Sequence, residues 1–280
     1  MTNHSQHRLP IVLTIAGFDP SGGAGVIADI RTIEALGCKA VAAITSITFQ
    51  NAKTYVGALN QRATSVRAQV EAILAEHEIV ALKIGMLPTP EIVHEVARLM
   101  LEFALPPPVI DPVMESTSGG KLMDEDAFEL FVTRLLPVAR LITPNIPEAE
   151  KLAGLNIRDE DAMRRAAGRI RELGARAVLV KGGHLKVKRS DVRGQRSGQE
   201  TRTATDLLDD HGEVTVFQSD WIDTPDVRGT GCVLSSAIAC GLARGVELKK
   251  AIKAAREFIS QVIQNSKLET PNSKLSATRS

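Results

Sequence analysis

The chain reads Leu9-Pro-Ile-Val-Leu-Thr-Ile-Ala16 and then Gly17-Phe-Asp-Pro-Ser-Gly-Gly-Ala-Gly25, and this stretch decides the fold. The apolar run predicts a buried strand, because strands of a parallel sheet are covered on both faces. The segment from Ala24 to Leu36 predicts a helix, with Gly37 as its C-terminal stop. A strand, a glycine-rich loop and a helix in this order are the unit from which α/β sheets are built.

The same alternation continues along the rest of the chain. We expect strands at 38–47, 79–84, 108–111, 140–143 and 177–180, and a hairpin formed by 203–208 and 213–218 around His211-Gly212. We expect helices at 65–76, 91–103, 125–136, 147–153, 159–173, 230–243 and 247–264. This order predicts an α/β sandwich with a mostly parallel central sheet, in a single domain over 1–280. Its core spans about 9–265, and 266–280 is expected to be a flexible tail.

Composition narrows the class of protein. The 280 residues are 44% hydrophobic and 24% charged, with a formal net charge of +1, which disfavours a nucleic-acid binder held by bulk charge. No apolar run is long enough for a membrane span, and residues 1–8 are polar, without a secretory signal. Three cysteines without metal-site spacing favour a reducing, cytoplasmic compartment.

The run Gly229-Thr-Gly-Cys232 opens the helix expected at 230–243. Free N–H groups at a helix N-terminus, with the helix dipole behind them, bind anions. Cys232 can accept a proton there, and we expect the helix N-terminus to lower the pKa of its thiol. An anion site beside a proton acceptor indicates phosphoryl transfer. The structural alternative is that Cys232 is a small buried residue, as Cys38 and Cys240 are expected to be.

Polar motifs are expected at the carboxyl ends of the strands, where ligands of such sheets collect. Asp111 follows one strand, and Asn145 and Glu148 flank the start of a helix; such oxygens suit Mg²⁺, or else they only cap the turn and the helix. Lys181-Gly-Gly-His184 follows another strand and offers positive charge to a phosphate. The glycines of 17–25 permit a tight turn or the close approach of a small ligand.

Together these motifs resemble one family. The chain resembles the hydroxymethylpyrimidine/phosphomethylpyrimidine kinases of thiamine biosynthesis, in the ribokinase-like superfamily, over about residues 10–265. The resemblance lies in the following collinear segments: Ala16 to Gly25 with Ala28-Asp29, Gln50-Asn51, Lys83-Ile-Gly-Met-Leu87, Asp111-Pro-Val-Met114 with Ser118-Gly119, Thr143-Pro-Asn-Ile-Pro-Glu-Ala149, Lys181-Gly-Gly-His184 and Gly229-Thr-Gly-Cys232.

The resemblance implies a three-layer α/β/α sandwich, phosphorylation by ATP of 4-amino-5-hydroxymethyl-2-methylpyrimidine and then of its monophosphate, and a homodimer. It implies that Gly229, Thr230 and Gly231 form an anion hole and that Cys232 is the base. Asp111 and Glu148 are implied at Mg²⁺, and Asn145, Glu148 and Lys181 at the nucleotide and its phosphates. The implied pyrimidine pocket is lined by Gly17, Ala24, Thr48, Gln50 and Met86.

Three features depart from the family pattern: Arg228 stands where histidine is usual, Thr48 occupies a position that is often apolar, and the segment 186–203 is long and basic. That segment is either a solvated loop or a lid over nucleotide phosphate. Two other functions stay open. One is a pyridoxal or other B6-vitamer kinase, disfavoured because related sugar and pyridoxal kinases usually have aspartate at position 232. The other is a non-catalytic pyrimidine-phosphate sensor, disfavoured because the phosphoryl-transfer residues are all present.

Overall fold

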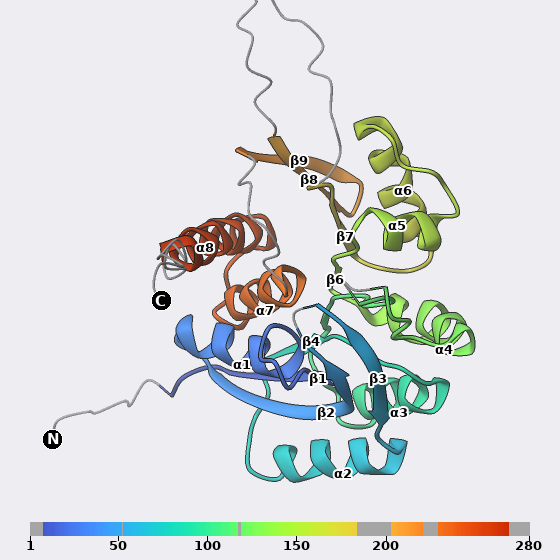
Figure 1. Ribbon diagram of the computed structural model, residues 1–280, viewed down its shortest axis with the longest axis vertical. Coiled ribbons are helices and arrows are strands. Elements are labelled where there is room, and N and C mark those ends of the chain that lie inside the picture. Colours follow the sequence, from blue (N-terminus) through green and yellow to red (C-terminus); the bar gives the residue numbers. More distant parts are fainter. Residues whose placement is uncertain (1–7, 52, 117–118, 184–202, 221–228, 269–280) are drawn as a thin grey trace, which may run out of the picture.

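One nine-stranded sheet forms the centre of the computed structural model (Figure 1), which describes residues 8–51, 53–116, 119–183, 203–220 and 229–268. The strands are β1 (Ile11–Phe18), β2 (Lys39–Gln50), β3 (Tyr55–Asn60), β4 (Ala81–Ile84), β5 (Val109–Ile110), β6 (Leu141–Ile142), β7 (Ala177–Lys181), β8 (Thr203–Asp210) and β9 (Glu213–Asp220). Their order in the sheet is β3-β2-β1-β4-β5-β6-β7-β8-β9. The strands from β2 to β7 are parallel neighbours, and β3, β8 and β9 pair antiparallel at the two edges.

Helices cover both faces of the sheet. One layer holds α1 (Gly25–Ala35), α7 (Thr230–Ala243) and α8 (Leu248–Leu268), which lie together in Figure 1. The other holds α2 (Ala63–Leu74), α3 (Pro90–Glu102), α4 (Glu125–Leu130), α5 (Ile146–Ala153) and α6 (Glu160–Glu172). The expected three-layer architecture with a mostly parallel sheet is therefore confirmed.

Two apolar cores, one on each face, follow from the alternation of side chains along the strands. On β1, Val12 packs into the core beneath α1, α7 and α8, whereas Leu13 and Ile15 pack into the core beneath α2 to α6. All three side chains are fully buried. Because both faces are covered, the strands have continuous apolar sequences, which is the pattern that predicted the fold.

Three local expectations were wrong. The helix expected over 125–136 ends at Leu130 and continues as a π-helical turn (Phe131–Leu135) and a 3-10 turn (Leu136–Val138), since Pro137 has no N–H with which to extend a helix. Strand β3 was not expected. Gly17, expected to follow the first strand, lies within β1, where the pairing with β2 shifts between Ala16 and Gly17. The hairpin at His211-Gly212 is confirmed, and both residues have positive φ.

Candidate active site

The N-terminus of α7 lies against the carboxyl ends of the central strands. Gly231 has no side chain to separate the helix from two polar groups: a Cβ there would lie 2.9 Å from Asp111 Oδ2 and 3.1 Å from Lys181 Nζ. Asp111 follows β5, and Lys181 ends β7. The structure thus brings the predicted anion-binding turn, Asp111 and Lys181 together at the carboxyl ends of the central strands.

The turn at 229 is also locked to the glycine-rich loop. Gly229 has φ +76°, and a Cβ there would lie 2.0 Å from the carbonyl oxygen of Gly23, so only glycine fits. Gly25 has φ +60°, and a Cβ there would lie 2.2 Å from the carbonyl oxygen of Gly17. The N–H groups in the first turn of α7, at Thr230, Gly231 and Cys232, have no acceptor within the helix. The two loops therefore form one surface with donors available to an anion.

A pocket of about 380 Å³, counted to its open mouth, lies beside Cys232. Its walls include all five residues expected to line the pyrimidine site: Gly17, Ala24, Thr48, Gln50 and Met86. Gly17 leaves room for Met86, whose sulfur would lie 2.8 Å from a Cβ at position 17. Thr48, the polar departure from the family pattern, donates its hydroxyl to the carbonyl oxygen of Phe18 at 3.0 Å. The hydroxyl of Thr48 is thus used within the wall of the pocket.

Two charged pocket residues were quoted in the sequence motifs without being given a role. Asp19 is 1% exposed. Its Oδ1 accepts from the backbone N–H and the hydroxyl of Ser21, whereas Oδ2 is buried and has no hydrogen-bond partner among the described residues. Lys83 is the other. The clue in the sequence was a lysine within the otherwise apolar strand Ala81-Leu-Lys-Ile84, since a charge on a covered strand requires a buried partner.

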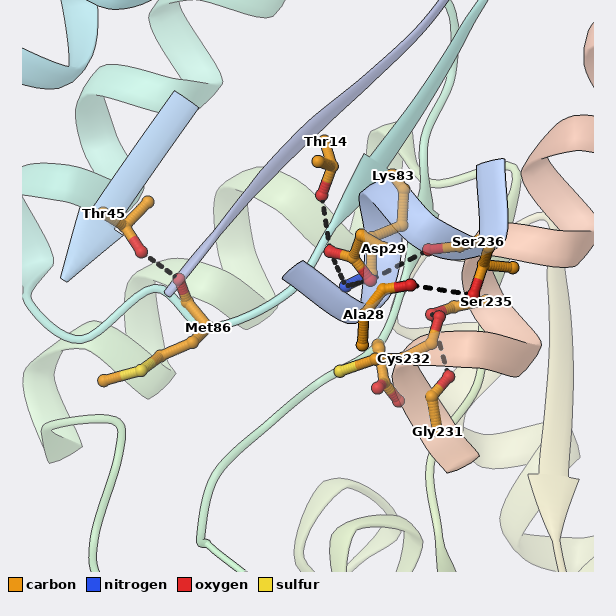
Figure 2. A network of polar contacts seen from close by, with 12 residues as sticks. Thr14, Ala28, Asp29, Thr45, Lys83, Met86, Gly231, Cys232, Ser235 and Ser236 are labelled. Atoms are coloured by element: carbon orange, nitrogen blue, oxygen red, sulfur yellow. Dashed lines mark hydrogen bonds and ion pairs between the residues drawn. The ribbon is translucent and has the colours of Figure 1, made fainter. Parts of the chain in front are cut away.

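The partner of Lys83 is Asp29, and both side chains are fully buried (Figure 2). The ammonium of Lys83 donates to both oxygens of Asp29, at 2.9 and 2.8 Å. Asp29 also accepts from the hydroxyl of Thr14 at 2.7 Å and from that of Ser236 at 2.9 Å. Three side chains, from β1, β4 and α7, therefore make four hydrogen bonds to one carboxylate on α1, and Ser236 among them lies one turn of α7 beyond Cys232.

Cys232 is 8% exposed, and its sulfur accepts the N–H of Gly25. Burial raises the pKa of its thiol to about 11, despite the opposing effect of the Lys83 ammonium and that hydrogen bond. The expectation that the helix N-terminus would lower this pKa was therefore wrong: removal of the thiolate from water outweighs the favourable groups around it. Cys38 and Cys240, the latter on α7, are buried in the apolar core on this face of the sheet, as expected.

The phosphate side of the site is built around Asp111. Lys181 Nζ donates to Asp111 Oδ1 at 2.8 Å, and the hydroxyl of Thr143 lies 3.3 Å from the same atom. Within the described part of the chain, no donor to Asp111 Oδ2 is recorded. This oxygen faces Gly231, as the short distance to a Cβ there indicates. One carboxylate oxygen therefore remains available to a ligand beside the anion-binding turn.

Asn145 and Glu148 form a capping box at the start of α5. The Asn145 side chain accepts from the N–H of Glu148 at 2.9 Å, and Glu148 Oε2 accepts from the N–H of Asn145 at 2.8 Å. The capping alternative left open by the sequence is therefore present. Glu148 is nonetheless 8% exposed, and burial raises its pKa to about 7, with the Asp111 carboxylate adding to the shift and Lys181 opposing it. It thus shares the electrostatic environment of Asp111.

Several predicted features lie outside the described residues: Ser118, His184, Arg228 and nearly all of the basic segment 186–203. Across the described ranges, no group of three or more His, Cys, Asp or Glu side chains is arranged to hold a metal ion. None of the helices described is long and apolar enough to cross a bilayer.

Comparisons with known proteins agree with this geometry. A family model described as phosphomethylpyrimidine kinase matches residues 19–275. The hydroxymethylpyrimidine/phosphomethylpyrimidine kinase of Rhizobium meliloti is 41% identical over 254 residues, which cover 90% of each chain. A crystal structure of phosphomethylpyrimidine kinase from Clostridium difficile is 36% identical, with a TM-score of 0.76 over 91% of this chain and 99% of that one.

A pyridoxal kinase shares the fold as well. The ADP complex of the Bacillus subtilis pyridoxal kinase is 35% identical to this chain, with a TM-score of 0.77 over 90% of each chain. Fold alone therefore does not separate the two activities, whereas the family model and the curated relatives carry the pyrimidine kinase name. This chain is a kinase of the ribokinase-like fold and belongs to the phosphomethylpyrimidine kinase family.

Proposed function

We propose that this kinase transfers the γ-phosphoryl group of ATP to 4-amino-5-hydroxymethyl-2-methylpyrimidine, and then a second phosphoryl group to the monophosphate. The observation that carries the proposal is the position of Cys232. It lines the pocket on one side and, through Gly231, adjoins Asp111 and Lys181 on the other. An acceptor in the pocket and a phosphoryl group at the turn would meet at this residue, and phosphoryl transfer depends chiefly on such alignment.

The polar groups of the pocket suit an aminopyrimidine. The side-chain amide of Gln50 has both a donor and an acceptor with which to meet a ring nitrogen and the exocyclic amine, and Met86 gives the ring an apolar face. Asp19 also lines the pocket, and its Oδ2 is buried without a partner among the described residues; we propose that this oxygen accepts from that amine. An amine donor would relieve the cost of leaving this oxygen unpaired.

The phosphate side suits a nucleotide with Mg²⁺. Two buried carboxylates, Asp111 and Glu148, fit an ion that takes one or two carboxylates together with waters and phosphate oxygens. When bound, Mg²⁺ would neutralise charge on the phosphates. Lys181 and the N–H groups at Thr230 and Gly231 would hold the transferred group, and Asn145 keeps Glu148 in place through the capping box.

The two steps differ in what the acceptor must lose. In the first, the hydroxymethyl oxygen forms a bond to the γ-phosphorus while the bond from that phosphorus to ADP breaks, and the hydroxyl proton passes to the Cys232 thiolate. In the second, the acceptor is a phosphate that is already largely ionised near pH 7. Cys232 is therefore needed as a proton acceptor in the first step only.

A separate assay of each acceptor tests the proposal. ATP consumption and product formation are measured with the pyrimidine alcohol, with its monophosphate and with pyridoxal, each as the only acceptor. We expect turnover of the first two. Turnover of pyridoxal alone would replace the proposal with a B6-vitamer kinase, the activity named for the Bacillus subtilis relative. Tight pyrimidine binding without turnover of any acceptor would instead indicate the sensor.

The Asp19→Asn variant sharpens the choice between acceptors. The amide that replaces the carboxylate can present an N–H to the exocyclic amine, so we expect the Michaelis constant for the aminopyrimidine to rise about tenfold or more. Pyridoxal has no such amine, so any residual pyridoxal activity should change less. Equal changes with both acceptors would contradict the proposed contact.

The Cys232→Ala variant tests the proton acceptor. We expect kcat of the first step to fall about 10²-fold or more, and that of the second to fall less than about tenfold. Because the thiol pKa is about 11, the wild-type first step should also rise with pH between 7 and 9 more steeply than the second. Cys240→Ala, in the apolar core, is the matched control. Equal losses in both steps would remove Cys232 as the base.

We also propose that the chain forms a homodimer through the β2–β3 edge. Three apolar side chains are exposed there: Val56 at 80%, Leu59 at 58% and Phe49 at 50%. Strand β3 ends the described sheet, so one of its backbone edges has no strand beside it. Light scattering after gel filtration should give twice the chain mass for the wild type and the chain mass for Val56→Lys. A monomeric wild type would overturn this proposal.

A further inference from the structure

The Lys83–Asp29 pair is not explained by substrate binding or by the stability of the fold alone. Replacing a buried ion pair with apolar residues is often neutral or stabilising. Stability of the fold is therefore not a sufficient reason for an ion pair deep in a core, and a specific role is sought. Both side chains of this pair are fully buried. The pair also lies at the active site, next to the first turn of α7 in Figure 2.

The two residues of the pair differ in their relation to the pocket. Lys83 is among the residues that line the pocket together with Cys232, whereas Asp29 is not. A Cβ on Gly85 would lie 2.8 Å from Lys83 Nζ, so this glycine makes room for the ammonium at the end of β4. The carboxylate stands behind, fixed by Thr14 and Ser236. Lys83 is therefore the member of the pair that borders the pocket, although its side chain has no exposed surface.

The ammonium also has a donor to spare. Two of its three N–H bonds are directed to Asp29, and no other acceptor for Lys83 is recorded among the described residues. Of the charged groups that act on the thiol of Cys232, Lys83 has the largest effect and lowers its pKa. Asp29 on α1 and Asp111 after β5 act in the opposite sense. The cation thus outweighs either carboxylate at the sulfur.

We propose that Lys83 is a positioning residue that acts through Cys232: held by Asp29, it keeps a buried positive charge beside the sulfur and favours the thiolate that accepts the substrate's proton. The inference rests on the proposed function, because it gives that proton transfer its electrostatic support. Two of the four hydrogen bonds of Asp29 hold the ammonium; asparagine at position 29 keeps an oxygen that can accept from it but removes the negative charge that opposes the thiolate.

Alkylation of Cys232 tests the inference without any substrate. The rate with iodoacetamide is measured by peptide mass spectrometry over pH 7 to 10, since only the thiolate reacts. At pH 8.5 we expect Lys83→Met to lower the rate about tenfold, equivalent to one unit of thiol pKa, and Asp29→Asn to raise it about threefold. The double variant, which carries neither charge, should fall between Lys83→Met and the wild type.

This order of alkylation rates distinguishes the loss of a charge from a loosening of the packing around the sulfur. Loosening would expose the sulfur and raise the rate in every variant, whereas loss of the cation lowers it. Thr14→Val, which removes a hydrogen bond to Asp29 but no charge, should stay within about twofold of the wild type. If Lys83→Met does not fold, the double variant still has to react more slowly than the wild type. A rate in Lys83→Met or the double variant equal to or above that of the wild type would overturn the inference.

Kinetics of the double variant link the effect to catalysis. We expect kcat of the first phosphorylation to fall about as much as the alkylation rate, and that of the second to change less than about twofold. Slower alkylation with unchanged first-step kcat would overturn the role of Lys83 in proton transfer. If the variants are alkylated more slowly but the wild type phosphorylates neither pyrimidine, the proposed function is overturned, while the coupling of Lys83 to the sulfur stands.

Discussion

Two lysine–aspartate pairs flank the first turn of α7, and they share a contact distance but differ in almost everything else. In each, the shortest N–O distance is 2.8 Å. The Lys83–Asp29 pair has no exposed surface, whereas the side chain of Lys181 is 18% exposed and that of Asp111 is 5% exposed. Asp29 accepts four hydrogen bonds at both oxygens, but Asp111 has one oxygen to which no donor from the described residues is recorded.

The difference shows how one chemical pair serves two purposes. The first pair is closed: all its strong contacts are internal, so it supplies a fixed field. The second is open: Lys181 is partly exposed and Asp111 has an oxygen without a donor among the described residues, which fits the roles proposed for them at a cation and a phosphate. A sealed pair is costly to break, because it leaves an uncompensated charge in a dry environment, while an open pair is relieved by water.

Removal of each lysine should give the largest contrast. We expect Lys83→Met to destabilise the protein by about 3–5 kcal/mol, because it strands the Asp29 charge in the core. Lys181→Met should cost less than about 2 kcal/mol, because this pair is not sealed: the side chain of Lys181 is 18% exposed and that of Asp111 5%. Thermal unfolding midpoints of the two variants provide the measurement. Similar losses of stability in the two variants would show that exposure does not determine the cost of breaking these pairs.

Removal of the open carboxylate should affect chemistry rather than folding. For Asp111→Asn we expect kcat to fall about 10²–10³-fold in both phosphorylation steps, since the charge near the transferred group is needed in each. The exposed Asp126→Asn serves as a control. Should only one step be impaired, Asp111 would belong to an acceptor rather than to the phosphates.

The carboxylate next to the open pair should make stability depend on pH. Glu148 has its pKa raised to about 7 in the folded protein, against an ordinary value of 4.5. Between these pH values the folded state retains a proton that the unfolded state has lost, so this contribution to stability is present below pH 4.5 and is lost as pH rises through 7. We expect the full loss to be about 3 kcal/mol.

Glu148→Gln isolates this contribution. In the absence of Mg²⁺, the unfolding midpoint of the wild type should fall relative to that of the variant between pH 5 and pH 8. Added Mg²⁺ should stabilise the wild type more than the variant at pH 8. A constant difference between the two proteins across this range would mean that Glu148 keeps an ordinary pKa.

The smallest expected effects concern the threonines that support each pair. Thr14 Oγ1 donates to Asp29 at 2.7 Å, so Thr14→Val should cost about 2 kcal/mol, as expected for a hydrogen bond to a buried charge. Thr143 Oγ1 lies 3.3 Å from Asp111 Oδ1, and Thr143→Val should cost less than about 1 kcal/mol. Chemical denaturation midpoints can rank the two. The reverse ranking would indicate that Asp111 is the more tightly held carboxylate.

Much of this arrangement was predictable because apolar periodicity and strand ends carry strong signals. The parallel strands, the helices and the pocket residues from Gly17 to Met86 follow from continuous apolar runs and the motifs after them. Strand β3 was missed because its half-exposed sequence gains its structure from pairing with β2. The single-domain organisation and the roles of the site residues stay predictions.

Electrostatics was harder to predict than architecture. The Asp29–Lys83 pair joins residues 54 positions apart, and nothing local to either residue indicates the other. For Cys232, helix-terminus reasoning gave the wrong direction because it considered the nearest dipole and not the burial of the sulfur. Burial depends on α1, β4 and the glycine-rich loop together, and only the folded chain brings these together.

The hydrogen bond from Ser236 to Asp29 joins residues 207 positions apart, and this has a consequence for folding during synthesis on the ribosome. When the first hundred residues have emerged, Asp29 and Lys83 are present but α7, which covers them, is not yet made. The pair then remains hydrated, because its face of the sheet still lacks the helix that covers it. We expect α7 to dock late in folding and the active site to form with that event, so that an interrupted chain lacks catalytic power however well its first half has folded.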